Sequence, residues 1–409
     1  MPHTTFARFR AMSPSIHALL YLYWIYGFTY ALTNVFIQIF LYQKFTSIQL
    51  NVYATMALFT GLMLGFCIPG YIAGRWKLNI KKGFLWSFIA NGIAILALLY
   101  ITDTLSALFV MLVIGFGQGI FYLTVNTFEL SETKDRERDF YSSVLNSGGQ
   151  ILSLVGPACA TALIWLSGNI LNIGNFTLLF AAAPAVYLLG FLCFSNLHDY
   201  YPKPVTWADI AHFFTDRRNQ YAQLYTAANG FQEILGIIVP PLVILFILGT
   251  ALRVGIYSTL FAIFSAVCVL AVANYRTYKN RFKIYGVTTL GLTVALTTLG
   301  YLFSFVGLIF YTLLEGVFTP LNNVSSHVVS LASMEIGRKE SDFYATMILR
   351  DFSLWVWRMV GGVVFLATID LLHTQKEFLS SGLYLEAAGF VGTYLGAYFL
   401  VKKMQEHLS

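Results

Sequence analysis

The sequence predicts an all-α membrane protein of twelve transmembrane helices, arranged as two pseudo-symmetric bundles of six. The first observation is composition, because 57% of the 409 residues are hydrophobic and only 11% are charged. Soluble domains carry about 25% charged residues. The second is a series of apolar segments of about 20 residues, each long enough to cross roughly 30 Å of hydrocarbon as a helix. These segments lack the period-two alternation of a membrane β-barrel.

The third observation is an internal repeat that relates the two halves of the chain. The segment Asp139-Phe140-Tyr141, preceded by charged residues, returns as Asp342-Phe343-Tyr344. Positions 139 and 342 are 203 residues apart, and the same offset carries Gly27-Phe28 onto Gly230-Phe231. An offset of about half the chain length that holds at two distant places indicates a duplicated architecture.

The predicted spans follow from the apolar segments in chain order. The ninth and tenth share residues 284–331, a run too long for one helix, and we expect the break between them near Ser304. The other ten are expected at 16–42, 52–74, 83–101, 105–128, 139–166, 176–194, 221–248, 254–273, 342–369 and 383–401.

A polar connector at 196–219 separates the two predicted bundles, residues 1–195 and 220–409. Within the connector, Thr206 and Asp209 have the spacing of a capping box, in which each side chain bonds the other residue's backbone amide. Apolar residues at helical spacing follow. The connector is therefore expected to form a short amphipathic helix at the cytoplasmic membrane surface.

Lys and Arg residues in the loops predict the orientation of the chain. Twenty of the 25 lie on the side that holds both termini, and Lys44, Arg253 and Lys376 lie on the other. Both termini are therefore expected in the cytoplasm, with the chain in the cytoplasmic (inner) membrane. The same bias accounts for the net charge of +6, so the basic composition does not call for a nucleic-acid partner.

The loop after the second span reads Gly70-Tyr71-Ile72-Ala73-Gly74-Arg75-Trp76-Lys77. With two six-span halves, cytoplasmic termini and a longer middle loop, the chain resembles the major facilitator superfamily over essentially its whole length. Gly70 and Arg75 match the family's loop motif, whereas Gly74 stands where the family usually has aspartate. The resemblance implies a secondary transporter that works by alternating access around a midplane site, with spans one, four, seven and ten around the cavity.

Ionisable side chains deep in apolar segments are the strongest candidates for such a site, because charge is costly inside a bilayer. Glu233 lies roughly 20 Å along the seventh span at 1.5 Å per residue. Glu315 and Arg358 lie at similar depth in spans ten and eleven. Arg350 and Asp351 lie in the cytoplasmic half of span eleven.

The first half contributes neutral amides to the same candidate set. Each amide could instead make an interhelical hydrogen bond, and the sequence leaves both roles open. The expected cavity is charged on one wall and amide-lined on the other. The candidate amides are Asn34, Gln38, Gln118, Asn126 and Gln150, with Asn323 as the second-half counterpart of Asn126.

Two roles are open for the buried acids. Burial disfavours an ionised carboxyl, which makes Glu233 or Glu315 a candidate proton carrier, and the alternative is a structural ion pair. Arg358 is expected to neutralise an acid or to hold a substrate carboxylate or phosphate through a bidentate contact. The predicted function is proton-coupled transport of a small organic solute. An uncoupled facilitator, or an exporter that exchanges a drug or metabolite for protons, is the alternative.

The gating residues are predicted from the repeat. Asp139 and Asp342 each open a span at the cytoplasmic face, where a carboxylate favours a helix N-terminus. Their repetition beside the basic loops predicts that they also pair with Arg75 or its counterpart when the cytoplasmic side is closed. Gly70, Arg350 and Asp351 complete this set.

Two other classes, a multi-spanning enzyme and a receptor without transport activity, are weighed against this prediction. The seven histidines are scattered, and the four cysteines lie in apolar runs without metal-ligand spacing. An enzyme would need such groups to cluster. We therefore expect no enzymatic activity, cofactor or metal. The expected partners are a small-molecule substrate, protons or another coupling ion, and the lipid bilayer around a monomer.

Overall fold

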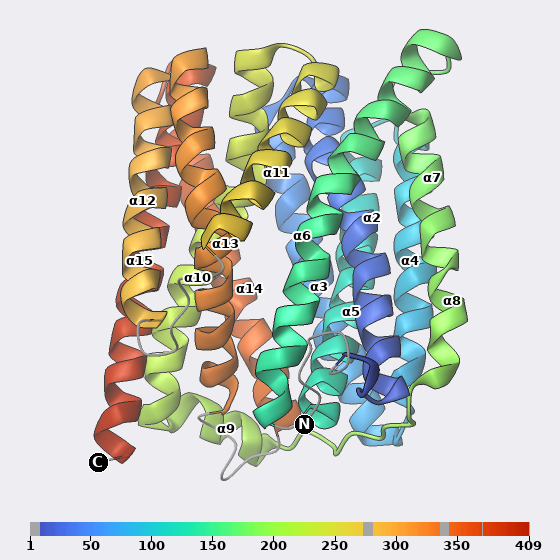
Figure 1. Cartoon of the computed structure of the whole chain (residues 1–409), viewed down its shortest axis with the longest axis vertical. Helices are drawn as coiled ribbons and strands as arrows, with labels where there is room; N and C mark the ends of the chain where they lie inside the picture. The colour runs from blue at the N-terminus through green and yellow to red at the C-terminus, as the bar shows by residue number, and fades with distance from the viewer. Residues whose placement is uncertain (1–8, 134, 273–280, 336–342, 370, 409) are drawn as a thin grey trace.

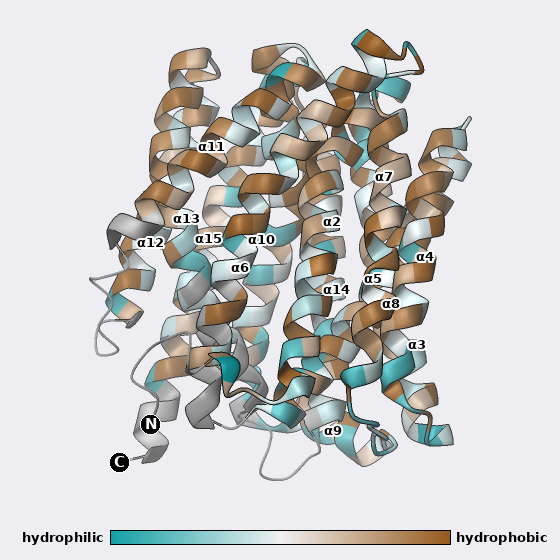
Figure 2. Ribbon diagram, turned by 45° about the vertical axis from the view of Figure 1, so that its right-hand side comes forward, coloured by the Kyte–Doolittle hydropathy of each residue, from teal (hydrophilic) through white to brown (hydrophobic). Residues whose placement is uncertain are grey.

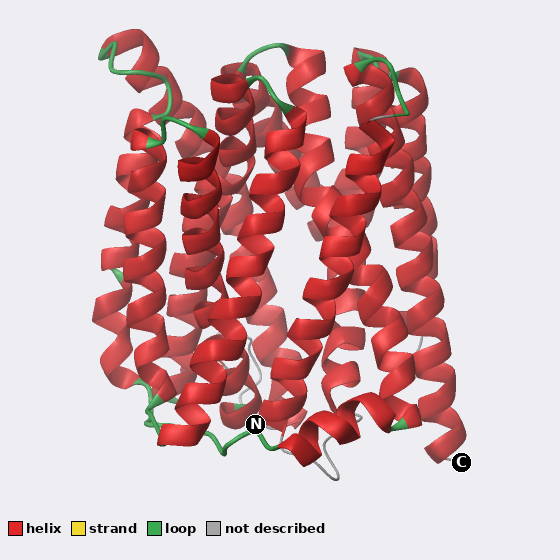
Figure 3. Ribbon diagram, turned by 180° about the vertical axis from the view of Figure 1, so that it is seen from behind, coloured by secondary structure: helices red, strands yellow, loops and turns green. Residues whose placement is uncertain are grey.

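A computed structural model describes residues 9–133, 135–272, 281–335, 343–369 and 371–408, apart from some side chains within these ranges. This described part is helical, with short loops and without β-strands (Figure 3). The helices run side by side along the long axis of the molecule (Figure 1). The predicted all-helical class is therefore confirmed.

The described residues of the first half form six long helical segments, the sixth of which is broken. Ser13 caps the first of them, because its hydroxyl accepts the backbone amide of Ile16 at 3.2 Å. One-turn segments η1 (Ile80–Lys82), η2 (Leu98–Tyr100), η3 (Leu166–Ile170) and η4 (Phe194–Asn196) adjoin them. The helices are α2 (Pro14–Phe45), α3 (Ile48–Trp76), α4 (Gly83–Ala97), α5 (Thr104–Glu132), α6 (Asp135–Trp165), α7 (Thr177–Leu188) and α8 (Gly190–Cys193).

Among its described residues, the second half contains six long helices after a short one in the connector. The predicted break in the long apolar run is confirmed, since a helix ends at Leu302, Phe303 has φ 38°, and the next helix begins at Phe305. The helices are α9 (Trp207–Thr215), α10 (Arg217–Leu248), α11 (Ala251–Val272), α12 (Arg281–Leu302), α13 (Phe305–Glu335), α14 (Phe343–Ile369) and α15 (Gln375–Leu408).

The connector helix α9 begins with the predicted capping box. The hydroxyl of Thr206 accepts the backbone amide of Asp209 at 3.3 Å, and the carboxylate of Asp209 accepts the backbone amide of Thr206 at 2.8 Å. Two amide groups at the helix start that would otherwise lack partners are thereby satisfied. Phe213 is buried against the bundle while Trp207 is exposed. Contact of this helix with a membrane surface stays a prediction.

Eleven helical segments of the described chain are long and apolar enough to cross a membrane. They include each predicted span except the twelfth. The helix α15 runs along α10 and α12 but is not among the eleven, because Glu386 and several small or polar residues interrupt its apolar stretch. Hydrophobic residues occupy much of the length of the helices (Figure 2), as expected for segments in contact with lipid. The count of twelve spans therefore stays a prediction.

The start of α2 and the end of α15 lie at the same end of the helical bundle, here called the N/C end (Figure 1). The assignment of this end to the cytoplasm, and the division into bundles 1–195 and 220–409, stay predictions. The fifth predicted span begins one turn earlier than expected, at Asp135 rather than Asp139.

Helices α3 and α5 cross in direct backbone contact. A Cβ atom added at Gly61 would overlap the carbonyl oxygen of Leu112, and one added at Gly115 would overlap that of Leu58. Gly65 and the α5 backbone make a similar contact. Glycine at these positions lets the two helix backbones touch, which fixes one wall of the first half.

The two halves meet along several helix pairs. Helix α3 packs against α14, α6 against α11, and α2 against α10. The indole Nε1 of Trp355 in α14 donates to the hydroxyl of Thr60 in α3 at 3.2 Å. At the end opposite the termini, the hydroxyl of Tyr42 donates to the amide oxygen of Gln375 at 3.2 Å. These contacts join the two halves on either side of the cavity described below.

Candidate functional site

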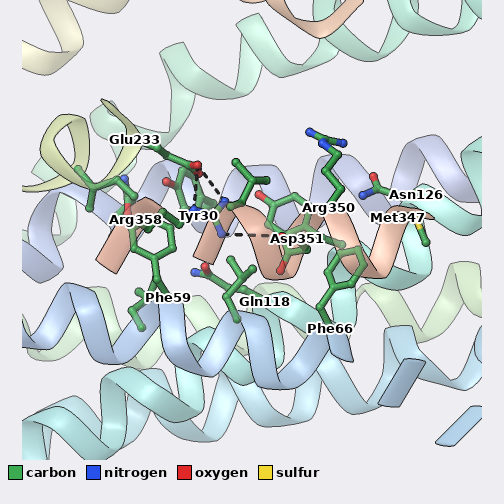
Figure 4. A pocket seen from close by; sticks show the side chains of 16 residues that line it. Tyr30, Phe59, Phe66, Gln118, Asn126, Glu233, Met347, Arg350, Asp351 and Arg358 are labelled. Carbon is green, nitrogen blue, oxygen red and sulfur yellow. Dashed lines mark hydrogen bonds and ion pairs between the residues drawn. The ribbon is translucent and has the colours of Figure 1, made fainter. Parts of the chain in front are cut away.

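A cavity of about 280 Å³ lies between the two halves of the chain. Helices α2, α3 and α5 line one side of it, and α10 and α14 line the other (Figure 4). The lining residues are Tyr30, Asn34, Leu58, Phe59, Leu62, Phe66, Gln118, Tyr122, Asn126, Glu233, Ile237, Met347, Arg350, Asp351, Leu354 and Arg358.

Arg358 of α14 and Glu233 of α10 form the charged centre of the cavity. The Nε and Nη2 atoms of Arg358 both donate to Oε2 of Glu233, at 3.0 and 2.8 Å. Arg358 is only 4% exposed, whereas the Glu233 side chain is 37% exposed. The guanidinium carbon lies 4.4 Å from the ring centre of Phe59 in α3, which is a cation–π contact with the other half of the chain.

Asp351 is a second carboxylate beside the same guanidinium. Its Oδ1 lies 3.8 Å from Nη1 of Arg358, and the residue is 8% exposed. Within the described part of the chain, Oδ2 of Asp351 and Nη1 of Arg358 have no hydrogen-bond partner. Burial makes such atoms costly, so this side of the guanidinium retains bonding capacity for a ligand or a water.

Arg350 adds a second cation to the cavity wall. Its Nη2 donates to the hydroxyl of Ser330 at 2.7 Å, while its buried Nε finds no acceptor among the described residues. Figure 4 shows its guanidinium turned away from Asp351 and on the side of Asn126. When all four groups are ionised, Arg350 and Arg358 balance Asp351 and Glu233, so the cavity wall is electrically neutral as a whole.

The wall contributed by the first half is neutral and carries amide and phenol groups. Asn34 and Tyr30 come from α2, and Gln118, Tyr122 and Asn126 come from α5. Figure 4 shows Gln118 near Asp351 and Arg358. The structure therefore brings three of the predicted amides together with all four of the charged residues that the sequence assigned to spans seven and eleven.

Three predicted amides lie outside the cavity lining. Gln38 is buried between α2 and α3, where its Nε2 donates to the hydroxyl of Thr55 at 3.1 Å. The side-chain amide of Asn51 donates to both the backbone oxygen and Oε1 of Gln38, at 2.8 and 3.0 Å. Gln38 thus has the interhelical role that the sequence left open. Gln150 is half-buried in α6, and Asn323 is exposed on α13.

The predicted acid Glu315 is not among the residues that line the cavity, and it interacts electrostatically with an acid that was not singled out from the sequence. Glu315 of α13 is hydrogen-bonded to the hydroxyl of Tyr311 and interacts with Glu386 of α15. Glu386 is 5% exposed. Its signal in the sequence is a single acid between Phe378 and Val401, a stretch otherwise free of charge.

Of the predicted gating residues, Gly70 has a defined contact between the two halves. Its backbone oxygen accepts the hydroxyl of Tyr344 in α14 at 3.1 Å. Arg75 is exposed at the end of α3. Asp342 and the side chain of Asp139 lie outside what the structure describes, so their pairing with Arg75 stays a prediction.

Steric contact with the connector explains why position 74 holds a glycine. A Cβ atom there would lie 2.6 Å from the backbone oxygen of Lys203 and 2.9 Å from Cα of Pro204. The connector therefore passes directly over α3, and an aspartate at this position would collide with its backbone.

A sequence profile of the Major Facilitator Superfamily matches residues 19–334, which is more than three quarters of the chain. The chain belongs to the Major Facilitator Superfamily. The resemblance found in the loop motif and the repeat is thereby confirmed. The family is one of multi-pass membrane transporters that carry small molecules, which indicates a secondary transporter rather than an enzyme.

Two solved structures share this fold. The crystal structure of a mutant form of the nucleoside transporter NupG superposes with a TM-score of 0.65 at 12% sequence identity, covering 94% of this chain and 99% of that one. A second NupG structure gives a TM-score of 0.62 at 12% identity, covering 95% of this chain and 99% of that one. At this identity the similarity establishes the fold.

One relative with a detectable sequence match is the uncharacterised protein YqgE of Bacillus subtilis (strain 168). It is 25% identical over 174 residues, which is 41% of this chain. The match spans 38% of the length of YqgE.

Proposed function

We propose that this protein is a proton-coupled secondary transporter that moves a small organic solute by alternating access. The observation that carries the proposal is the contact of Arg358 with Glu233 in a cavity lined by both halves of the chain. Rocking of two bundles about such a cavity exposes it to one side of the membrane at a time. The proposal places the protein in the cytoplasmic (inner) membrane as a monomer, with the N/C end inside.

The proposed cycle uses the different burial of the two partners. Arg358 stays charged and buried, whereas Glu233 is partly open to the cavity. A carboxylate or phosphate of the substrate can take the place of Glu233 on the guanidinium through a bidentate contact. The displaced Glu233 then carries an unpaired charge in a poorly hydrated space, which a proton removes. Substrate binding and proton binding are thereby linked at one side chain.

The runner-up is an uncoupled facilitator. The ion pair favours this alternative, because Arg358 already neutralises Glu233. Asp351 lies beside the same guanidinium as a second negative charge, so no proton is needed to balance Glu233. In that case the charges hold α10 and α14 together and the solute crosses down its own gradient. Exchange of a drug or metabolite for protons is a variant of the first proposal with the opposite direction of solute movement.

Transport by purified protein in liposomes tests the proposal. Nucleosides are the first probes, because NupG is a nucleoside transporter and because Phe59, Tyr30 and Tyr122 offer ring surfaces here. Carboxylate-bearing and phosphate-bearing metabolites complete the panel. We expect an imposed pH gradient to drive accumulation of one class of solute. Accumulation that is absent with every probe, while counterflow is present, would support the facilitator.

Variants of the cavity separate binding from coupling. Glu233→Gln is expected to abolish accumulation driven by the pH gradient while counterflow of the solute survives, and Glu315→Gln tests the other predicted carrier in the same way. Arg358→Ala is expected to weaken binding of the solute itself. If both glutamine variants still accumulate solute in response to the pH gradient, neither acid carries the coupling proton.

A further inference from the structure

The charged groups of the cavity determine which charge its occupant should carry. Of the 16 described residues that line it, four have side chains that are ordinarily charged at neutral pH, namely Arg350, Arg358, Asp351 and Glu233. Their charges cancel while Glu233 is bonded to Arg358. In the proposed cycle the occupant displaces Glu233 and a proton neutralises it, which leaves the cavity wall with one net positive charge.

One net positive charge in a poorly hydrated cavity favours an occupant with one negative charge. A monoanion makes the loaded cavity neutral. A dianion leaves one negative charge, whereas a neutral solute or a zwitterion leaves one positive charge. Charge balance therefore favours a monocarboxylate over a phosphate monoester, which carries close to two negative charges at pH 7, and over a nucleoside or an amino acid. This step rests on the proposed function, because it uses the proton on Glu233.

Three buried polar atoms indicate what else the occupant carries. Within the described part of the chain, Oδ2 of Asp351, Nη1 of Arg358 and Nε of Arg350 have no hydrogen-bond partner. The two nitrogens can only donate, and the ionised carboxylate can only accept. A carboxylate on the occupant can therefore serve the nitrogens but has no hydrogen for Asp351. A hydroxyl group both donates and accepts, so it can serve either kind of atom.

The opposite wall and the volume of the cavity fit a compact solute with several hydroxyl groups. Figure 4 shows Gln118 near Asp351 and Arg358, and Asn126 on the side of Arg350. A side-chain amide has both donors and acceptors, so each can bond a hydroxyl in either direction. The volume of about 280 Å³ is slightly smaller than the roughly 300–1,000 Å³ of typical small-molecule pockets.

We propose that the substrate is a small hydroxylated monocarboxylate. Its carboxylate binds Arg358 in place of Glu233, and one of its hydroxyl groups donates to Oδ2 of Asp351. Nε of Arg350 donates to a further hydroxyl oxygen. Asp351 then distinguishes hydroxylated acids from plain carboxylates, because only the former provide the hydrogen that its buried oxygen lacks.

A matched series of three-carbon solutes tests this class by thermal unfolding of the purified full-length protein in detergent. The probes are glycerate, propionate without the hydroxyls, glycerol without the carboxylate, tartronate with a second carboxylate, and serine with an ammonium group. At ten times its Kd, glycerate should lower the unfolding equilibrium constant about tenfold, and the other probes should change it less than about twofold at the same concentration. Gluconate, glucitol and glucarate repeat the comparison with six carbons. The proposal is overturned if neither glycerate nor gluconate stabilises the protein more than its matched solutes do.

Variants that change the charge of the cavity should change the preferred charge of the solute. Asp351→Asn keeps an acceptor oxygen but removes a negative charge, so affinity should shift from glycerate toward tartronate by about tenfold or more. Arg350→Gln removes a positive charge and should shift affinity from glycerate toward serine and glycerol. The control is Glu377→Gln, which removes an exposed carboxylate from the first turn of α15 and should leave the preference unchanged. An unchanged preference for glycerate in both cavity variants would contradict the proposal.

Two further measurements separate this inference from the proposed function. Calorimetry in buffers with different ionisation enthalpies counts the protons taken up with each glycerate or gluconate, and we expect about one. Selective binding without proton uptake would support the substrate class and overturn the proton coupling. In liposomes, accumulation of a nucleoside, a phosphate ester or an amino acid in response to the pH gradient, with none of gluconate or glycerate, would support the coupling and overturn the substrate class.

Discussion

The contact between Arg358 and Glu233 makes a quantitative prediction about stability. Arg358→Met keeps most of the side-chain volume but leaves Glu233 and Asp351 without their cation. Removal of one partner from a buried ion pair costs about 3–5 kcal/mol, and the 37% exposure of Glu233 places this case at the lower end. Glu233→Gln should cost about 1–2 kcal/mol, because Asp351 at 3.8 Å and the new amide oxygen still serve Arg358.

The double variant distinguishes a pair from two independent residues. Since Arg358→Met already removes the cation that Glu233 contacts, adding Glu233→Gln should cost little more stability than Arg358→Met alone. The free energy of unfolding is measured from tryptophan fluorescence during denaturant titration in detergent micelles. Arg358→Met combined with Glu377→Gln is the matched control, which should be additive. Additivity within about 0.5 kcal/mol for the Glu233 and Arg358 variants would refute the coupling.

Three further predictions concern other contacts. Gly74→Asp, which restores the family's usual residue, should lower the free energy of unfolding by about 1–3 kcal/mol because the connector backbone occupies the space. Tyr344→Phe should cost about 0.5–1.5 kcal/mol by leaving the Gly70 carbonyl without its donor, and should raise cysteine labelling at the N/C end. The pKa of Asp103 is lowered chiefly because the Ser106 backbone amide donates to it. Its stabilising effect is present above about pH 4 and is lost as pH falls, so Asp103→Asn should flatten the acid side of a thermal unfolding profile.

Local signals in the sequence were sufficient to predict the helical elements. The capping box at Thr206 and Asp209 depends on hydrogen bonds within four residues, and the break near Ser304 depends on the length of an apolar run. Each can therefore be predicted without knowledge of the neighbouring helices. The orientation and the twelfth span depend on the surrounding membrane, and they remain predictions.

Membership of the cavity lining was only partly predictable, because it depends on what covers each face of a helix. Asn34 and Gln38 are one turn apart on α2, so their side chains leave the helix in almost the same direction. Asn34 faces open space, whereas Gln38 is covered by Asn51 and Thr55 of α3. No property of α2 alone distinguishes the two positions, since the difference arises from the path of α3.

Glu386 was missed for a related reason. The family resemblance places the twelfth span outside the cavity, so an acid on that span is not expected beside a functional group. Glu315 was singled out as a costly acid, and no local pattern relates it to a residue 71 positions away. The relation between the two acids depends on how α13 and α15 pack against α10 and against each other.

The backbone contact between α3 and α5 restricts how this protein can change in evolution. At Gly61 and Gly115 the atoms that exclude a side chain are the carbonyl oxygens of Leu112 and Leu58, and every amino acid has that oxygen. A harmful substitution at an ordinary core position can be rescued by a smaller side chain opposite it. Here no replacement of the partner residue removes the obstructing atom, so alanine at these glycines should have no second-site suppressor at the contact. A suppressor screen should recover only reversion to glycine or changes that move a whole helix.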